Sequence, residues 1–324
     1  MKTCWTSLFG LLIGIAAPIA AQRGRGVEAA GDRFRWENQA PWGVAHGAAI
    51  AEAIKLMATD PTDASLRVEP FKIFDNVYYV GMKHVSAFLV TTSDGLVLLD
   101  ATFPTTAELT LDNVRKLGFK PENIEYILIS HSHADHYGGA GRIKELTGAH
   151  IVMSLKDWQS VEQQQAAGGQ GGRGAGIALK RDIVKGEGDT LNAGDTEFKF
   201  YLTPGHTVGA LSVEFKVFDR GKAYRALSPG GLGMQFGPEG TAPFIASMEH
   251  LVALGPWDVL LANHPFYMLE NIEDIRNGLA RRSSGNGPHP LLQGSGKINE
   301  WLSGAAKVAR EKRAAEISRN SVRE

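Results

Sequence analysis

The block His131-Ser-His133-Ala-Asp135-His136 constrains this chain most, because it places three imidazoles and one carboxylate within six residues. It follows directly on the apolar run 124–130, which predicts a strand that ends at the histidines. Imidazole nitrogen and carboxylate oxygen suit Zn²⁺, and two such ions close together can share and activate one water. The block therefore predicts metal ligands delivered by the end of a strand.

A chance cluster of surface histidines is the alternative. Only ten histidines occur in 324 residues, so three of them at spacings of two and three, with an aspartate between, are hard to obtain without a metal to hold. We therefore favour a metal-dependent hydrolase over a fortuitous cluster.

Length and charge bound the fold and the partners. A chain of 324 residues exceeds the usual single domain, but one large α/β sandwich with a leader and terminal helices accommodates it. The formal net charge of -1 indicates no electrostatic attraction to nucleic acid or acidic lipid. We expect a small-molecule substrate and no nucleic-acid partner, and the oligomeric state stays open.

The first 21 residues have the three-part layout of a secretory signal. Lys2 precedes the apolar stretch 8–17, and small residues and then a polar run follow. The apolar stretch is too short for a typical membrane helix, with a retained anchor as the alternative. We expect a signal peptide at 1–21 and a secreted, periplasmic protein without stable membrane association after leader removal. The one cysteine, Cys4, lies in this leader, so the mature protein has no thiol to ligate metal or form a disulfide.

After the leader, residues 22–67 are polar and glycine-bearing, with one possible helix at 48–57, and predict an N-terminal extension. From Val68 the pattern changes to short β-rich runs separated by turns. Strands are expected at 71–80, 86–92, 95–100, 124–130, 151–154, 197–202, 210–218, 223–227 and 258–262, and helices at 105–117, 138–146, 155–165, 242–254, 270–281 and 296–317. Because the strands gather in two blocks, each followed by helices, we expect an α/β domain over 68–324 with two central sheets and helices outside.

The segment 166–176 is rich in glycine and low in complexity, so it cannot pack a core. A flexible surface loop is one interpretation. A mobile flap beside the site is the other, since long loops in compact domains are often functional.

Two further histidines stand where predicted strands end. His206 follows the strand 197–202 within Thr-Pro-Gly-His-Thr, and His264 follows the strand 258–262 within Asn-His-Pro. Gly205 permits a tight turn that leaves His206 exposed at the rim. Each histidine alone would be read as an ordinary surface or capping residue. Because both emerge from the same kind of position as His131, we predict that they are metal ligands as well.

Together these motifs resemble the metallo-β-lactamase superfamily. The matching elements are Leu98-Leu99-Asp100, the block 131–136, Gly205-His206-Thr207 and Asn263-His264-Pro265, in the family's order over roughly 68–265, and the runs 74–81 and 116–121 also look like subclass B3 β-lactamases. The resemblance implies an αββα sandwich of two mixed sheets flanked by helices, with two zinc ions per chain. His131, His133 and His206 would bind one zinc. Asp135, His136 and His264 would bind the other.

Two absences favour subclass B3 within this resemblance. Most other hydrolases of the superfamily bridge the metals with an aspartate on a strand after the Gly-His motif, whereas no acid occurs here between Asp219 and Glu239. The other lactamase subclasses place a cysteine on the second zinc, and the mature chain has none. Diiron relatives carry glutamate where this chain has His133, which disfavours oxygen chemistry.

The resemblance implies a zinc-dependent β-lactamase that opens the β-lactam ring with a zinc-bound hydroxide. Asp135 would fix this nucleophile as well as the second metal. A hydrolase of another small cyclic amide, lactone or ester is the alternative. A noncatalytic zinc-binding or scaffold protein is a third, disfavoured because a ligand set that leaves room for water is usually catalytic.

Four more residues have candidate roles around this site. Asp100 is predicted to orient a ligand or the loop, with a turn carboxylate at a strand end as the alternative. The resemblance to subclass B3 implies that Ser228 recruits a substrate carboxylate, with Ala226 at such a position as the alternative. His84 is interpreted as an exposed loop histidine, with a place over the site as the alternative.

Overall fold

The structure is a computed structural model that describes residues 55–167, 177–234, 237–268, 270–283, 285, 287–292 and 294–321. The expected signal peptide, most of the N-terminal extension and nearly all of the glycine-rich segment 166–176 lie outside these residues. Among the described helices, none combines the length and the apolar composition needed to cross a lipid bilayer.

The first sheet has seven strands in sequence order. They are β1 (Phe71–Phe74), β2 (Val77–Tyr79), β3 (Phe88–Thr92), β4 (Gly95–Leu99), β5 (Ile124–Leu128), β6 (His150–Met153) and β7 (Ile183–Val184). Strands β1 to β4 pair antiparallel, and β4 to β7 pair parallel. Because β4, β5 and β6 run parallel, their carboxyl ends lie at one edge, and the loop that leaves β5 there carries the histidine block.

The second sheet has five strands in the order β12-β11-β10-β9-β8. They are β8 (Thr190–Ala193), β9 (Thr196–Leu202), β10 (Leu211–Asp219), β11 (Lys222–Ser228) and β12 (Val259–Leu260). Only β11 and β12 pair parallel. The two sheets meet near the site, where the backbone N–H of Leu211 donates to the Ser130 carbonyl across 2.8 Å.

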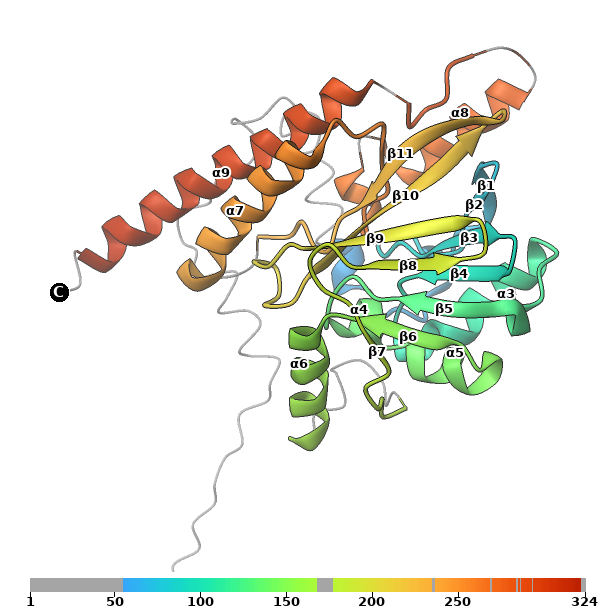
Figure 1. The fold of residues 1–324 in the computed structure, drawn as a ribbon, viewed down its shortest axis with the longest axis horizontal. Helices are drawn as coiled ribbons and strands as arrows, with labels where there is room; N and C mark the ends of the chain where they lie inside the picture. The colour runs from blue at the N-terminus through green and yellow to red at the C-terminus, as the bar shows by residue number, and fades with distance from the viewer. Residues whose placement is uncertain are drawn as a thin grey trace, which may run out of the picture. The chain divides into compact units, whose positions relative to one another are not determined.

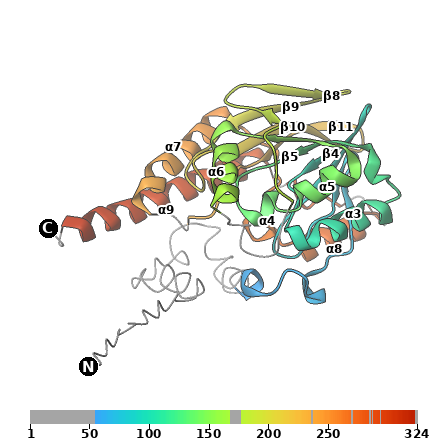
Figure 2. The same ribbon diagram turned by 90° about the horizontal axis from the view of Figure 1, so that it is seen from below.

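Helices flank both sheets, with the short α4 at the strand ends beside the histidine block (Figures 1 and 2). They are α3 (Ala107–Lys116), α4 (Ala134–Tyr137), α5 (Ala140–Thr147), α6 (Leu155–Ala166), α7 (Pro238–Leu254), α8 (Ile272–Ser283) and α9 (Ser295–Ser321). Helices α3, α5 and α6 pack their apolar faces on the first sheet, burying Leu111, Ile143 and Trp158 in one core cluster. Helices α7 and α9 pack against each other, and α9 contacts β12.

The predicted α/β architecture of two mixed sheets with outer helices is confirmed. One expected strand, 71–80, is instead the hairpin β1–β2, because Asp75 and Asn76 turn the chain and hydrogen-bond to the β10–β11 end of the second sheet. The short strands β7 and β8 and the single-turn helix α4 were not expected. Only the end of the possible helix 48–57 is described, and residues 55–57 are helical there.

The described end of the predicted N-terminal extension packs on the sandwich. Leu66 is fully buried and forms a small core with Met82, Val85 and Phe103. The backbone N–H of Lys83 donates to the Leu66 carbonyl at 2.9 Å. This contact ties the extension to the loop that contains His84.

Candidate metal centre

Six predicted ligands converge where strands of both sheets end. His131 and His133 lie in the loop after β5, and Asp135 and His136 lie in α4. His206 follows β9, and His264 follows β12. The predicted tight turn before His206 is present, since Gly205 has a φ of +141° and the backbone of Phe244 leaves no room for a side chain there.

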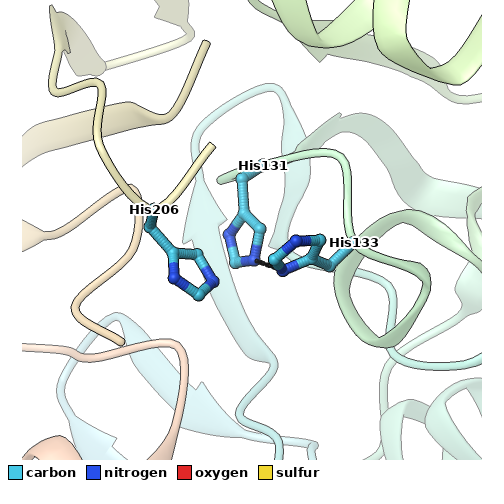
Figure 3. Close-up of side chains that lie close together, drawn as sticks. All are labelled: His131, His133 and His206. Carbon is cyan, nitrogen blue, oxygen red and sulfur yellow. Dashed lines mark hydrogen bonds between the residues drawn. The ribbon is translucent and has the colours of Figure 1, made fainter. Parts of the chain in front are cut away.

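The first cluster consists of three imidazoles that face one another, His131, His133 and His206 (Figure 3). The Nε2 atom of His131 lies 3.0 Å from Nδ1 of His133. The His206 ring stands nearly perpendicular to both of the other rings, at 88° and 82°. His131 is buried, His206 is half-buried and His133 is exposed, so one side of the cluster stays open to water and substrate.

The second cluster consists of Asp135, His136 and His264. The two imidazole Nε2 atoms lie 3.2 Å apart. Asp135 Oδ2 lies 3.4 Å from the His136 Nε2 atom and 3.7 Å from that of His264. The His131 and His136 rings are 4.1 Å apart between centroids, so the two clusters are neighbours.

Hydrogen bonds to the ring nitrogens that face away from the clusters fix the tautomer of His206 and His264. His206 Nδ1 donates to the Gly233 carbonyl at 2.7 Å, and His264 Nδ1 donates to the His84 carbonyl at 2.6 Å. A carbonyl only accepts, so each Nδ1 carries the proton. The lone pair of the neutral ring is then on Nε2, which faces the cluster.

Burial and the two carboxylates set the ionisation of the clusters. Burial lowers the pKa of His206 to about 4 and that of His264 to about 3, so both rings are neutral at neutral pH. Burial also acts to lower the pKa of His136, but Asp135 and Asp100 outweigh it and raise that pKa to about 10. Burial opposes ionisation of Asp135, yet His136 and His264 hold its pKa below the ordinary value.

The donor atoms of both clusters fit a pair of divalent cations. A tetrahedral zinc ion with bonds of about 2.0–2.1 Å has ligand atoms roughly 3.3 Å apart. The separations of 3.0 Å in the first cluster and 3.2–3.7 Å in the second lie around this value. All donors of each cluster lie within 4.8 Å of one another. These are two candidate sites of the composition N₃ and N₂O.

Asp100 links the two clusters from behind. Its carboxylate accepts from His136 Nδ1 at 2.8 Å and from the backbone N–H and hydroxyl of Ser130, both at 2.8 Å. Because the Ser130 hydroxyl proton points to Asp100, the His131 Nδ1 atom, 3.1 Å away, must donate to Ser130. Asp100 follows the end of β4 and contacts a predicted ligand, and its orienting role stays a prediction.

Sequence reasoning missed three groups that hold the histidines. The side chain of Asn263 donates to Ser130 Oγ at 3.2 Å. The one sequence feature that pointed to Asn263 is its position directly before His264. The carbonyl groups of Gly233 and His84 accept from ligands, and sequence carries no signal for a backbone acceptor. The interpretation of His84 as exposed was wrong, because its side chain is fully buried and stacks on Phe103 at 5.6 Å.

The two alternatives for substrate recruitment differ in exposure. Ala226 is fully buried inside β11, whereas Ser228 ends that strand and is 8% exposed. Ser228 precedes Gly230, whose carbonyl lies 3.4 Å from Asn263 Nδ2. Of the two, Ser228 lies at the end of the strand and is the more exposed, and its contact with substrate stays a prediction.

Comparison with known proteins places this geometry in a family. Residues 80–217 match the metallo-beta-lactamase superfamily. The chain is 29% identical over 196 residues to a hydroxyacylglutathione hydrolase of Acidiphilium cryptum, covering 59% of this chain and 68% of that protein. It is 36% identical over 83 residues to an uncharacterized protein of Aquifex aeolicus, covering 26% of this chain and 39% of the relative.

Among solved structures, the chain is similar to BJP-1, a subclass B3 metallo-beta-lactamase of Bradyrhizobium japonicum. The match has a TM-score of 0.68 and 27% identity, and it covers 82% of this chain and all of the other. The sequence match, the paired sheets and the two ligand clusters agree with one another. The chain has the metallo-β-lactamase fold, its residues 80–217 match the metallo-beta-lactamase superfamily, and subclass B3 metallo-beta-lactamases are among its structural neighbours.

Proposed function

We propose that this chain is a dizinc hydrolase that opens β-lactam rings. The observation that carries the proposal is the pair of N₃ and N₂O donor clusters, 4.1 Å apart between the His131 and His136 rings. Zinc suits these donors because all six are imidazole nitrogen or carboxylate oxygen. The exposed His133 and the half-buried Asp135 leave an opening for water and substrate.

The protein's part in the reaction is orientation. Two zinc ions, when bound, would supply Lewis-acid activation of water and of the amide carbonyl. Asp135 Oδ2 lies 3.4 Å from His136 Nε2, and from this position in the second cluster it would hold the attacking water. The carbonyl groups behind His206 and His264 keep each ring in one tautomer, so neither ring has to reorganise during turnover.

The end of β11 supports a β-lactam over a glutathione thioester. Most other hydrolases of the resembled superfamily carry a bridging aspartate on a strand after the Gly-His motif, and this chain has no acid between Asp219 and Glu239. Gly231 occupies that region, where a Cβ atom would come within 2.6 Å of the His206 ring. The backbone at Gly231 therefore packs against the His206 ring. This segment supports a predicted ligand but offers no carboxylate that could bridge two metal ions.

A thioester or lactone hydrolase is the second candidate, and the similarity to a hydroxyacylglutathione hydrolase favours it. The same two clusters serve both reactions, since each is attack of an activated water on a carbonyl carbon. The two candidates differ in the leaving group and in how the substrate is anchored.

A substrate panel separates them. The zinc-loaded chain is assayed with a penicillin, a cephalosporin, a carbapenem, a glutathione thioester and an uncharged lactone. We expect turnover of at least one β-lactam, and Asp135→Asn should lower kcat by about 10² or more, because the nucleophile loses its position. The exposed His150→Gln is the matched control and should keep wild-type turnover.

Ser228→Ala tests the anchoring of the substrate. It should raise KM for carboxylate-bearing β-lactams with little change in kcat, because a hydroxyl contact made equally in the ground and transition states affects binding. It should barely affect the uncharged lactone. Turnover of the thioester or the lactone, with no β-lactam opened by a chain that holds two zinc ions, would overturn the β-lactamase proposal in favour of the second candidate.

A further inference from the structure

Asp157 is a fully buried carboxylate in the first turn of α6, outside both ligand clusters. The spacing Ser154-x-x-Asp157 is that of a capping box, in which the acid would reach back to the backbone of the cap. Half of this pattern is present, since Ser154 Oγ accepts from the Asp157 N–H at 3.2 Å. The carboxylate itself turns away from the cap, toward two loops that carry metal ligands.

The contacts of the Asp157 carboxylate lie next to all three histidines of the first cluster. Asp157 Oδ1 accepts from the Ser132 hydroxyl at 3.0 Å, and Oδ2 accepts from the Ser132 backbone N–H at 3.1 Å. Ser132 stands between His131 and His133. Oδ2 also accepts from the Thr207 hydroxyl at 2.9 Å, and Thr207 follows His206 directly.

These two loops belong to different sheets. Ser132 follows β5 of the seven-stranded sheet, and Thr207 follows β9 of the five-stranded sheet. A single carboxylate therefore joins the two halves of the sandwich at the point where the histidines of the first cluster must meet. Because a displacement of either loop would move at least one imidazole, this joint controls the spacing of the donor atoms.

The backbone of Gly209 brings α6 close enough for this contact. A Cβ atom at Gly209 would lie 2.4 Å from Ser154 Oγ and 2.6 Å from the Asp157 nitrogen, so only glycine allows the approach. The Gly209 N–H is a further donor to the carboxylate. Every one of these partners donates, which suits an ionised carboxylate that can only accept, and hydrogen bonds to a charged acceptor are the stronger kind.

The second cluster is supported by other groups. His136 donates to Asp100, and His264 donates to the His84 carbonyl. Asp100 also reaches the first cluster through Ser130, which contacts His131, whereas Asp157 contacts only loops of the N₃ cluster.

We propose that Asp157 is a positioning residue that sets the metal affinity of the His131, His133 and His206 cluster by bracing its two loops across the sheets. The inference rests on the proposed function, in that this cluster binds a metal ion. It assigns Asp157 no contact with substrate or metal.

Metal binding by the full chain tests this role. Zn²⁺ affinity is measured by competition with a chromophoric chelator, and Co²⁺ binding is followed by visible absorption. His206→Ala and His264→Ala identify which binding step belongs to which cluster. Asp157→Asn keeps the shape of the side chain but replaces one accepting oxygen by an NH₂ group, which cannot accept from Ser132 or Thr207. Asp182→Asn is the matched control, because Asp182 also accepts a backbone N–H, from Ile151 at 3.1 Å, and contacts no predicted ligand.

Asp157→Asn should lower the Zn²⁺ affinity of the first cluster, the binding step that His206→Ala removes. The expected loss is about 10–100-fold, the range usual for residues that hydrogen-bond to metal ligands. The step removed by His264→Ala should change by less than about threefold. The Co²⁺ absorption of the first site should shift or weaken in the same variant. Asp182→Asn should match the wild type in both steps.

Thr207→Val removes one donor and leaves Asp157 in place, and it decides the matter if Asp157→Asn does not fold. It should weaken the first step in the same direction by a smaller factor. Two results would show that Asp157 has only a structural role. One is an equal loss of Zn²⁺ affinity at both clusters; the other is an unchanged affinity of the first cluster in both Thr207→Val and Asp157→Asn. A wild-type chain that binds no Zn²⁺ in either step would instead overturn the proposed function, and this inference with it.

Discussion

The histidines of the two clusters use their two ring nitrogens differently. His206 and His264 hold a proton on the outer nitrogen against a carbonyl, which leaves the inner nitrogen free to bind a cation. Burial depresses the pKa of both rings, so they need not lose a proton to bind metal at neutral pH. His136 differs, because the two carboxylates beside it raise its pKa and a cation must displace its proton.

His289 is a buried histidine outside the site, and its hydrogen bonds require the neutral ring. Nε2 donates to the Ile73 carbonyl at 2.8 Å, while Nδ1 accepts from the Leu291 N–H at 3.1 Å. Burial lowers its pKa below the ordinary 6.5, and the repulsion from Arg282 adds to this against the attraction of Asp219. Below pH 6.5 the unfolded chain therefore binds more protons than the folded one, and stability falls as the pH falls.

We expect this effect in urea unfolding of the metal-loaded chain at pH 7.5 and 5.5. The unfolding free energy of the wild type should fall with the pH, and His289→Phe should fall less, because it keeps the stacking on Phe74 but cannot titrate. His150→Gln, at an exposed histidine, should keep the wild-type decline. Identical declines in the wild type and His289→Phe would contradict this account of His289.

At the scale of elements, helix α6 acts as a joint between the sheets. Its first turn contacts the loops that follow β5 and β9, and its buried Trp158 donates to the Ile183 carbonyl at 3.0 Å. The cap at Ser154 fixes where the helix begins, and with it the position of Asp157. Helix stability and the geometry of the first cluster are therefore linked.

Ser154→Ala should lower the free energy of unfolding by about 0.5–2 kcal/mol, the usual cost of losing an N-cap side chain. Ser160→Ala is the matched control in the same helix, because the half-buried Ser160 hydroxyl donates to the Lys156 carbonyl within the helix and does not cap it. Its effect should be within about 0.5 kcal/mol. Urea unfolding of both variants measures the difference, and equal losses would argue against a structural role for the cap.

At the scale of the whole molecule, the sequence predicted the features that repeat along the chain. The alternation of apolar runs and turns predicted the two blocks of strands, because burial of one face imposes a periodicity of two on a strand. The ligands in the block 131–136 were found from their close spacing, and His206 and His264 from their places after predicted strands. That the same six residues converge is shown by the structure, and their binding of zinc stays a prediction.

Features that depend on contacts between distant segments were not predicted. The turn at Asp75 and Asn76 depends on a partner 146 residues away, at Gly221. The burial of His84 depends on Phe103 and on the loop that carries His264. The contacts of Asp157 were not predicted, because nothing in the sequence places Ser132 and Thr207 beside it.

The metal content of the purified chain tests the central claim most directly. Elemental analysis should find about two zinc ions per chain, and His206→Ala and His264→Ala should each retain one, because each removes a ligand from a different cluster. One iron without zinc, or a single ion per chain at saturating zinc, would contradict the assignment of two adjacent sites.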